Sequence, residues 1–232
     1  MHPIILGVPR SGTSLCANLL TKMGFDFVGK DSMDPQLPTQ FNPDGYFQRK
    51  SIHTFLSACM QRDFDNFNNF CTFTDDERKI FHTLLPKRGE WGIKEPYLQR
   101  YLPDLTSMTS HQFLFIVVYR NPQDTIHSIE NMQKAVHNKT EYSEKIWRAY
   151  YTNVLCIMKK SHSKVIFLSY DNLVLHPELT YTKFCSDLQE YFQILKPLTR
   201  KELSNTIKPH NIINNDTCSE TSKQLLHCLN SM

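Results

Sequence analysis

A short polar segment near the start of the chain has the residue types needed to bind an anion. It consists of Arg10, Ser11, Gly12, Thr13 and Ser14. Glycine lets the backbone approach a ligand closely, the three hydroxyl groups are hydrogen-bond donors, and arginine adds a permanent cation with several N–H groups. If the segment precedes a helix, unpaired N–H groups and the positive end of the helix dipole point toward the same place. We therefore predict an anion-binding loop here.

This loop differs from the phosphate-binding loop of nucleoside triphosphatases. That motif reads G-x-x-x-x-G-K-[ST], whereas Thr13 follows Gly12 in this chain, so the usual lysine is absent. The absence weakens the case for nucleoside triphosphate hydrolysis. The structural alternative at this point is an ordinary serine-rich turn between a strand and a helix.

A second pair of anion-binding side chains follows the most apolar run of the chain. Arg120 comes directly after residues 113–119, which read FLFIVVY, and Ser128 lies further along the same segment. Pro122 is typical of a first helical turn, so Arg120 should sit at a strand end and Ser128 about two turns into a helix. We expect both side chains to reach one anion. The alternative is an arginine that caps a neighbouring helix and a serine that packs in a turn.

A third candidate is Lys94, near the end of residues 90–96, which read EWGIKEP and are expected to be a short strand. In open parallel sheets, ligands bind in the crevice at the carboxyl ends of the strands. A lysine at that end would add positive charge to the crevice. Without other evidence, a lysine in this position is more often a surface residue in a turn.

A parallel sheet would bring these candidates together. Apolar runs bounded by turn-forming residues are expected to be strands, and helical patterns separate them. The pattern predicts an α/β fold with a central parallel sheet flanked by helices, and the length fits one domain over residues 1–232. The expected strands are residues 3–8, 90–96, 113–119 and 164–168. Expected helices include residues 48–62, 75–85, 97–108, 142–160 and 177–192, and two short ones at 200–206 and 219–229.

The composition argues against several classes of protein. A formal net charge of +3 and 21% charged residues describe an ordinary surface that does not require a nucleic-acid partner. No apolar run reaches membrane-spanning length. Strand-forming sequence begins within a few residues of Met1, which leaves no room for a signal or transit segment, so we expect a cytoplasmic protein.

Cysteine and histidine usage argues against a metal site. The seven cysteines are scattered, odd in number and without a C-x-x-C pair, as expected of reduced thiols rather than of a disulfide framework or a zinc site. The ten histidines form no H-x-x-x-H or H-x-H group. We expect no structural metal.

Taken together, these motifs resemble those of the sulfotransferases that use 3′-phosphoadenylyl sulfate (PAPS). The similarity runs through nearly the full length, and its nearest branch is the bacterial-type or tyrosylprotein-sulfotransferase-like one. Two of the segments given below, at residues 7–15 and 117–128, are specific in combination. A serine-rich phosphate loop that lacks the lysine, together with R-N-P and a serine eight residues after the arginine, is rare outside this family. The segments are GVPRSGTSL at residues 7–15, NPDGYF at 42–47, WGIKEP at 91–96, VVYRNPQDTIHS at 117–128 and SYDNL at 169–173.

The resemblance implies a P-loop NTPase-like sulfotransferase fold and transfer of a sulfuryl group from PAPS to a hydroxyl or amine by in-line displacement. The product of the donor would be 3′,5′-ADP (PAP). Residues 10–14 would hold the 5′-phosphosulfate, and Arg120 with Ser128 would hold the 3′-phosphate that distinguishes the donor from ATP. Lys94 and Arg10 match the cations that the family places beside the transferring group, where they stabilise charge on the leaving phosphate. No metal is expected.

The catalytic base is where the chain departs from the family pattern. Relatives with N-P-x-G-Y-[FW] commonly continue with a glutamate that is taken to be the base, whereas this chain has Gln48, which cannot accept a proton at neutral pH. Nearby candidates are His53, Asp31, Asp44 and Glu95, and we favour Asp44 or His53. Asp31 and Asp44 fall in residues 30–45, a proline-rich stretch expected to be either a binding loop or a surface connection.

A second departure concerns the adenine ring of the donor. Some relatives have an aromatic residue where this chain has Leu15, so adenine must stack elsewhere, and Tyr170 is the candidate. The aromatic residues within 64–73 fit either a ring-lined acceptor cleft or core packing. The acceptor is expected to be a small molecule, a carbohydrate or a peptide, and the sequence indicates neither its identity nor an oligomeric state.

Two other functions stay open. A P-loop nucleotide or small-molecule kinase would bind ATP with magnesium, and the absent lysine opposes it. A catalytically weakened protein that only binds PAP or PAPS is the other alternative, and Gln48 favours it.

Overall fold

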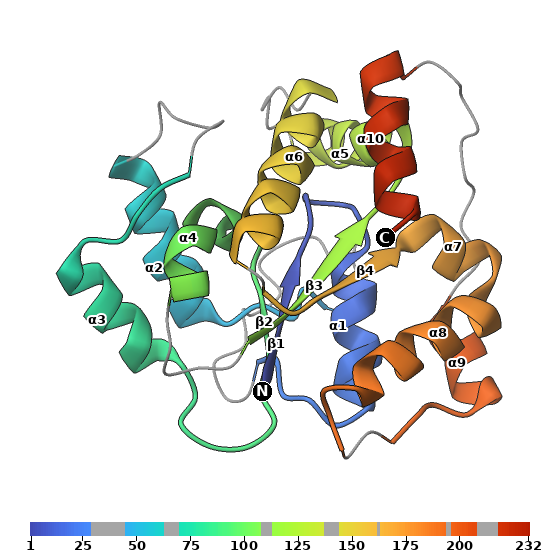
Figure 1. Cartoon of the computed structure of the whole chain (residues 1–232), viewed down its shortest axis with the longest axis horizontal. Coiled ribbons are helices and arrows are strands. Elements are labelled where there is room, and N and C mark those ends of the chain that lie inside the picture. Colours follow the sequence, from blue (N-terminus) through green and yellow to red (C-terminus); the bar gives the residue numbers. More distant parts are fainter. Residues whose placement is uncertain are drawn as a thin grey trace.

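A parallel sheet of four strands forms the centre of the computed structural model (Figure 1). The structure describes residues 1–28, 45–62, 70–107, 113–136, 144–161, 163–193, 196–207 and 218–232. Within them the strand order is β2-β1-β3-β4, and each neighbouring pair runs parallel. The predicted α/β class is confirmed. The strands are β1 (His2–Leu6), β2 (Ile93–Lys94), β3 (Phe113–Tyr119) and β4 (Val165–Ser169).

Helices cover both faces of this sheet. In Figure 1, α1, α8 and α9 lie on one side of the strands, and α2, α3 and α4 lie on the other. The helices are α1 (Thr13–Lys22), α2 (Lys50–Arg62), α3 (Asp75–Leu84), the 3₁₀ helix η3 (Pro96–Tyr101), α4 (Leu102–Ser107), α5 (Pro122–Val136), α6 (Glu144–Ser161), α7 (Tyr170–Leu175), α8 (Pro177–Gln189), α9 (Arg200–Thr206) and α10 (Glu220–Asn230).

The two faces of the sheet carry separate apolar cores, because successive strand residues point in opposite directions. On β3, Phe115 and Val117 belong to the core shared with α2, α3 and α6, whereas Leu114 and Ile116 pack with α1 and α8. All residues of β3 are buried. A strand buried on both faces reads as a continuous apolar run, which is why its bounds were predicted without error.

The strand register brings the candidate residues to one edge of the sheet. Ile5 on β1 pairs with Lys94 on β2, and Leu6 pairs with Val117 on β3. Because all strands are parallel, their carboxyl ends meet at the same edge. The loop after β1, Lys94 and Arg120 therefore leave the sheet on the same side.

The segment after β2 differs from the expected strand and long helix. β2 ends early because Glu95 is the N-cap of η3 and Pro96 is its first residue. The chain then makes η3 and α4 as two pieces instead of one helix over residues 97–108. Pro103 has no N–H group and is tolerated only in a first helical turn, which is where α4 has it.

Helix α7 was not predicted as a helix. It begins at Tyr170, directly after β4, and the Ser169 hydroxyl accepts a hydrogen bond from the Asn172 N–H at 3.2 Å. A serine cap of this kind starts a helix even when the segment is too short to show a helical pattern. As a result, Tyr170 and Asp171 lie in the first turn of a helix at the functional edge of the sheet.

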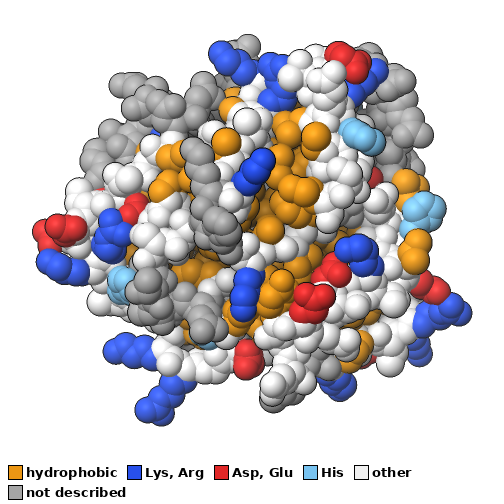
Figure 2. All heavy atoms as spheres, in the orientation of Figure 1, with side chains coloured by type: hydrophobic (Ala, Val, Ile, Leu, Met, Phe, Trp, Pro, Cys, Tyr) orange, Lys and Arg blue, Asp and Glu red, His pale blue; other side chains and the backbone are white. Residues whose placement is uncertain are grey.

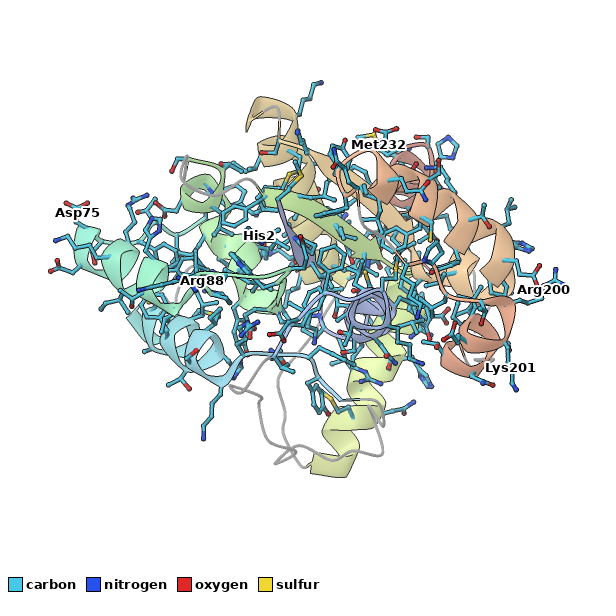
Figure 3. The ribbon with its side chains drawn as sticks, turned by 90° about the horizontal axis from the view of Figure 1, so that it is seen from below. His2, Asp75, Arg88, Arg200, Lys201 and Met232 are labelled. Carbon is cyan, nitrogen blue, oxygen red and sulfur yellow. The ribbon has the colours of Figure 1, made fainter. Side chains whose placement is uncertain are left out.

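The outer surface is mixed in character. Figure 2 shows lysine and arginine side chains spread over that face among acidic ones, with apolar side chains gathered toward its middle. Figure 3 places Asp75 of α3 and Arg200 of α9 at opposite ends of the molecule, with His2 at the start of β1 between them. Of the helices that the structure describes, none combines the length and apolar character needed to cross a lipid bilayer.

Candidate functional site

The loop between β1 and α1 makes a sharp turn just before the helix. Gly12 has a φ angle of 97° and Arg10 one of 69°, so both lie in the left-handed region. The Gly7 N–H donates to the Tyr150 hydroxyl of α6 at 2.7 Å. The Ser11 N–H donates to the Val8 carbonyl at 3.1 Å, which closes the turn. The loop is therefore held both by its own backbone and by a helix from the opposite face.

The N-terminus of α1 suits an anion. Its N-cap is Gly12, which has no side chain to cap the helix, and its first turn contains no acidic residue. No side-chain cap in the described structure offsets the positive end of this helix. The predicted strand–loop–helix arrangement is present, with the small residues of the loop directly before the first turn.

The loop contacts the serine of the second predicted pair. The Arg10 Nε–H donates to the Ser128 Oγ of α5 at 3.1 Å, although the two residues are far apart in sequence. Burial lowers the pKa of the Arg10 guanidinium, Tyr46 and Tyr170 oppose this, and the positive charge of Arg120 adds to it. Arg10 thus lies within electrostatic range of Arg120, and the two predicted groups are close together.

Arg120 lies at the end of β3, near two carboxylates that do not hydrogen-bond to its Nε atom. It is buried, with a side chain that lies between two carboxylates. Its Nη2 atom is 4.0 Å from Asp124 Oδ2 and its Nε atom is 3.9 Å from Asp171 Oδ1. Asp171 is itself fixed, because its Oδ2 atom accepts from the Asn121 N–H at 2.8 Å. Burial raises the pKa of Asp171, and the Asn121 hydrogen bond and Arg120 oppose this.

Tyr170 joins the loop to Arg120. The guanidinium carbon of Arg120 is 4.8 Å from the centroid of the Tyr170 ring, a cation–π distance. The same ring packs closely against Gly12, because a β-carbon added at Gly12 would lie 2.2 Å from Cδ2 of the ring. The predicted role of Tyr170, stacking on adenine, stays a prediction, and the structure adds that the ring packs against protein groups of both predicted anion sites.

Lys94 lies at the end of β2, as the sequence predicted, and it is buried rather than at the surface. Its Nζ atom donates to the Tyr46 carbonyl at 2.8 Å and lies 5.9 Å from the centroid of the Tyr46 ring. Burial lowers the pKa of Lys94 to about 8, Glu95 opposes this, and Arg10 adds to it. Lys94 and Arg10 therefore share one region of positive charge.

Glu95, a buried carboxylate next to Lys94 and one of the candidate bases, contacts a second candidate, His53. The Glu95 side chain is only 2% exposed, and its Oε2 atom is 2.9 Å from Nδ1 of His53. The same oxygen accepts from the Gln48 amide at 2.7 Å. The hydrogen bond to Glu95 raises the pKa of His53, while burial and Lys94 lower it. The His53 ring also stacks on Tyr97, with centroids 5.8 Å apart.

Sequence reasoning named His53 and Glu95 as separate candidates and did not predict that they are in contact. The spacing between α2 and the end of β2 depends on the tertiary structure, so no local pattern reveals it. Of the other candidates, Asp44 and Asp31 lie outside the described residues, and their roles stay predictions.

Comparison with protein families assigns the chain. A model described as "Sulfotransferase family" matches residues 4–193. The chain belongs to the sulfotransferase family. The match runs from β1 to just beyond α8, so it includes every site residue described above, whereas α9 and α10 lie outside it.

Comparisons with individual proteins add little to this assignment. A solved structure, the crystal structure of a sulfotransferase from Alicyclobacillus acidocaldarius, matches with 14% sequence identity and a TM-score of 0.44, and the match covers 87% of each chain. Comparison with curated proteins finds no match.

Membership in the sulfotransferase family makes sulfuryl transfer the general reaction of this site. Such a reaction moves a negatively charged group between oxygen or nitrogen atoms, so it needs cations and a proton acceptor. Arg10, Lys94 and Arg120 are cationic side chains at this edge of the sheet. Among the described residues, no cluster of three or more His, Cys, Asp or Glu side chains has a geometry that could hold a metal ion.

Proposed function

We propose that this sulfotransferase uses PAPS as its donor and releases PAP. The loop of residues 10–14 and the N-terminus of α1 bind the 5′-phosphosulfate, and Arg120 with Ser128 binds the 3′-phosphate. The observation that carries the proposal is the hydrogen bond of 3.1 Å from Arg10 Nε to Ser128 Oγ. It brings a residue of the first group into contact with a residue of the second, so the two proposed phosphate sites lie near each other.

The charges at this edge suit such a ligand. The open N-terminus of α1 offers backbone N–H groups to one anionic end. Arg120 offers a buried guanidinium whose Nε atom makes no hydrogen bond within the described structure. A bisphosphorylated adenosine has two separate anionic ends, whereas ATP has one chain of phosphates and a free 3′-hydroxyl, so the pair Arg120 and Ser128 would discriminate between them.

The proposed transfer is an in-line displacement at sulfur. A lone pair of the acceptor oxygen or nitrogen forms the new bond to sulfur, and the bond from sulfur to the bridging phosphate oxygen breaks. Its electron pair goes to the leaving phosphate of PAP, and the proton of the acceptor goes to a base. Because little covalent work is left to the protein, positioning and charge stabilisation provide most of the catalysis. In this chain Arg10 and Lys94 would stabilise charge on the leaving phosphate.

The proposal covers the donor more closely than the acceptor. The acceptor group is a hydroxyl, or an amine, on a small molecule, a carbohydrate or a peptide. The mixed surface in Figure 2 does not favour one of these three. We also retain from the sequence the proposals that residues 1–232 form one domain and that the protein acts in the cytoplasm.

The donor is tested by the thermal stability of the protein with different nucleotides. At a concentration of about one hundred times its Kd, PAP should stabilise the folded state by about 2.7 kcal/mol. For a chain of this size that is a rise in Tm of about 5–10 °C. AMP should stabilise it less, and ATP with magnesium should have little effect. Stabilisation by ATP with magnesium and not by PAP would favour the kinase.

Transfer itself is tested with labelled PAPS and a panel of hydroxyl and amine acceptors. Label that moves to an acceptor, with one PAP formed for each transfer, supports the enzyme. Strong binding of PAP without transfer to any acceptor would favour the weakened binding protein instead. Gln48 is the observation that keeps this second function in view.

A further inference from the structure

Glu95 is a buried acidic residue with two hydrogen-bonding partners on one oxygen atom. Its side chain is 2% exposed, and Oε2 is 2.7 Å from the Gln48 amide nitrogen and 2.9 Å from His53 Nδ1. A buried carboxylate is costly unless it is paired or hydrogen-bonded, so these two contacts are what make its position favourable. A third contact, from the Tyr97 N–H to Oε1 at 3.4 Å, ties the residue to the start of η3.

These contacts determine which nitrogen of the His53 ring carries the proton. An ionised carboxylate only accepts hydrogen bonds, so the Nδ1 atom of a neutral His53 must be the donor to Glu95. The other ring nitrogen, Nε2, then keeps its lone pair. A histidine held in this way is ready to accept a proton through Nε2, in the manner of other histidine–carboxylate pairs.

The pair lies beside the cations of the transfer site. Glu95 directly follows Lys94, whose charge acts on His53, and the charge of Arg10 acts on Lys94 in turn. The groups that face the His53 ring are Glu95 and Lys94 from the end of β2, the Tyr97 ring from η3 and the Gln48 amide from the segment before α2. The side chain of His53 remains 30% exposed, so the ring is not sealed off from solvent.

We propose that His53 is the general base of the transfer and that Glu95 is the positioning residue that orients it, with Gln48 holding the carboxylate in place. This inference rests on the proposed function and names the base that the function leaves open. His53 Nε2 takes the proton of the acceptor hydroxyl while the acceptor oxygen bonds to sulfur and the bridging bond breaks toward PAP. The base is thus a histidine of α2 that is oriented by the carboxylate directly after β2.

The test replaces the carboxylate by its amide, Glu95→Gln, and measures the His53 ring directly. Long-range ¹H–¹⁵N correlation spectra across a pH series report both the pKa and the tautomer of His53, and they need no acceptor. Loss of the hydrogen bond to this carboxylate and of its negative charge should lower the pKa of His53 and should populate the second tautomer. Glu190→Gln, on an exposed residue at the end of α8, is the matched control and should change neither.

Steady-state kinetics provide a second test of the same inference. In Glu95→Gln, the acidic limb of the kcat profile should move to lower pH together with the pKa of His53, and kcat on the plateau should fall. If this variant fails to fold, His53→Ala replaces it, because the ring is partly exposed. It should lower kcat roughly 10²- to 10⁴-fold.

The outcomes separate this inference from the proposed function. A Glu95→Gln spectrum with the wild-type pKa and tautomer of His53 would overturn the inference, and so would a His53→Ala protein that transfers at the wild-type rate. Either result leaves stabilisation by PAP intact. Failure of PAP to stabilise even the wild type would instead overturn the proposed function, whatever the spectra show.

Discussion

The ring of Tyr170 occupies the space above Gly12 in which a β-carbon would lie. An added β-carbon would be 2.2 Å from Cδ2 of the ring, and the ring in turn lies 4.8 Å from the guanidinium carbon of Arg120. A tyrosine from the first turn of α7 therefore sets the distance between the loop after β1 and the arginine after β3. Any change at Gly12 must move this ring or the loop.

Gly12→Ala should therefore lower both stability and affinity for PAP. Gly24→Ala is the matched control, since Gly24 also has a positive φ angle, of 108°, but an added β-carbon there would meet nothing within 4 Å. The control should cost about 1 kcal/mol of left-handed strain. Gly12→Ala should cost about 1–3 kcal/mol more because of the clash. Urea unfolding measures the difference, and equal losses in the two variants would contradict the packing described here.

The fold and part of the site were open to sequence reasoning for identifiable reasons. β3 was predicted within its observed bounds because burial on both faces makes it uniformly apolar. The loop at residues 10–14 was predictable because its residue types and its place between strand and helix are local features. The contact between Arg10 and Ser128 fits the expectation of two neighbouring anion sites, although the atoms involved could not be foreseen.

What the sequence could not provide is set by tertiary packing. WGIKEP reads as a strand, but the Glu95 side chain and Pro96 end the strand and start η3. Burial of Glu95 against His53 depends on where α2 packs, and no spacing in the sequence encodes it. Arg120 was expected to have its charge available for a phosphate, and only the structure shows Asp124 and Asp171 on either side of it.

Ser128→Ala tests the proposed 3′-phosphate site. The change removes the acceptor of the Arg10 Nε hydrogen bond and the hydroxyl proposed to contact the phosphate. A hydrogen bond to a charged group contributes about 1.5–3 kcal/mol, so affinity for PAP should fall about ten- to a hundredfold. Affinity for AMP, which lacks the 3′-phosphate, should fall much less. Isothermal titration with both nucleotides measures this, and Ser204→Ala on the exposed face of α9 serves as the control.

If Ser128→Ala lowered the affinities for AMP and PAP by the same factor, the serine would act only on the shape of the loop. The 3′-phosphate would then have to bind elsewhere, and Arg120 would lose its proposed role as well.

The binding of PAP should weaken as pH rises above about 8. Burial lowers the pKa of Lys94 to about 8, so its positive charge is lost as the pH passes that value. The free energy of unfolding should instead increase as pH rises above about 8. An unfolded lysine keeps its proton up to about pH 10.4, so between these pH values the unfolded state binds more protons, and the free energy of unfolding from this group increases with pH.

Titration of PAP at pH 7 to 9.5 measures the effect on binding. Lys94→Met should bind PAP weakly and with little pH dependence over this range, because it retains an apolar stem without the titrating group. Lys201→Met, on an exposed residue at the edge of the molecule in Figure 3, should keep the wild-type profile. A wild-type affinity that is constant up to pH 9.5 would exclude Lys94 as a contact of the donor.

Replacements of Tyr170 decide whether its ring stacks on adenine or sets the position of Arg120. Tyr170→Phe keeps the ring on Gly12 and Arg120, so affinity for PAP should change little. Tyr170→Ala removes the ring and frees Arg120 to move toward Asp124 or Asp171. If the ring only stacked on adenine, Tyr170→Ala would lower the affinities for AMP and PAP by the same factor, since both nucleotides carry that base. We expect a larger loss for PAP, because the guanidinium that should meet the 3′-phosphate is the group that rests on the ring.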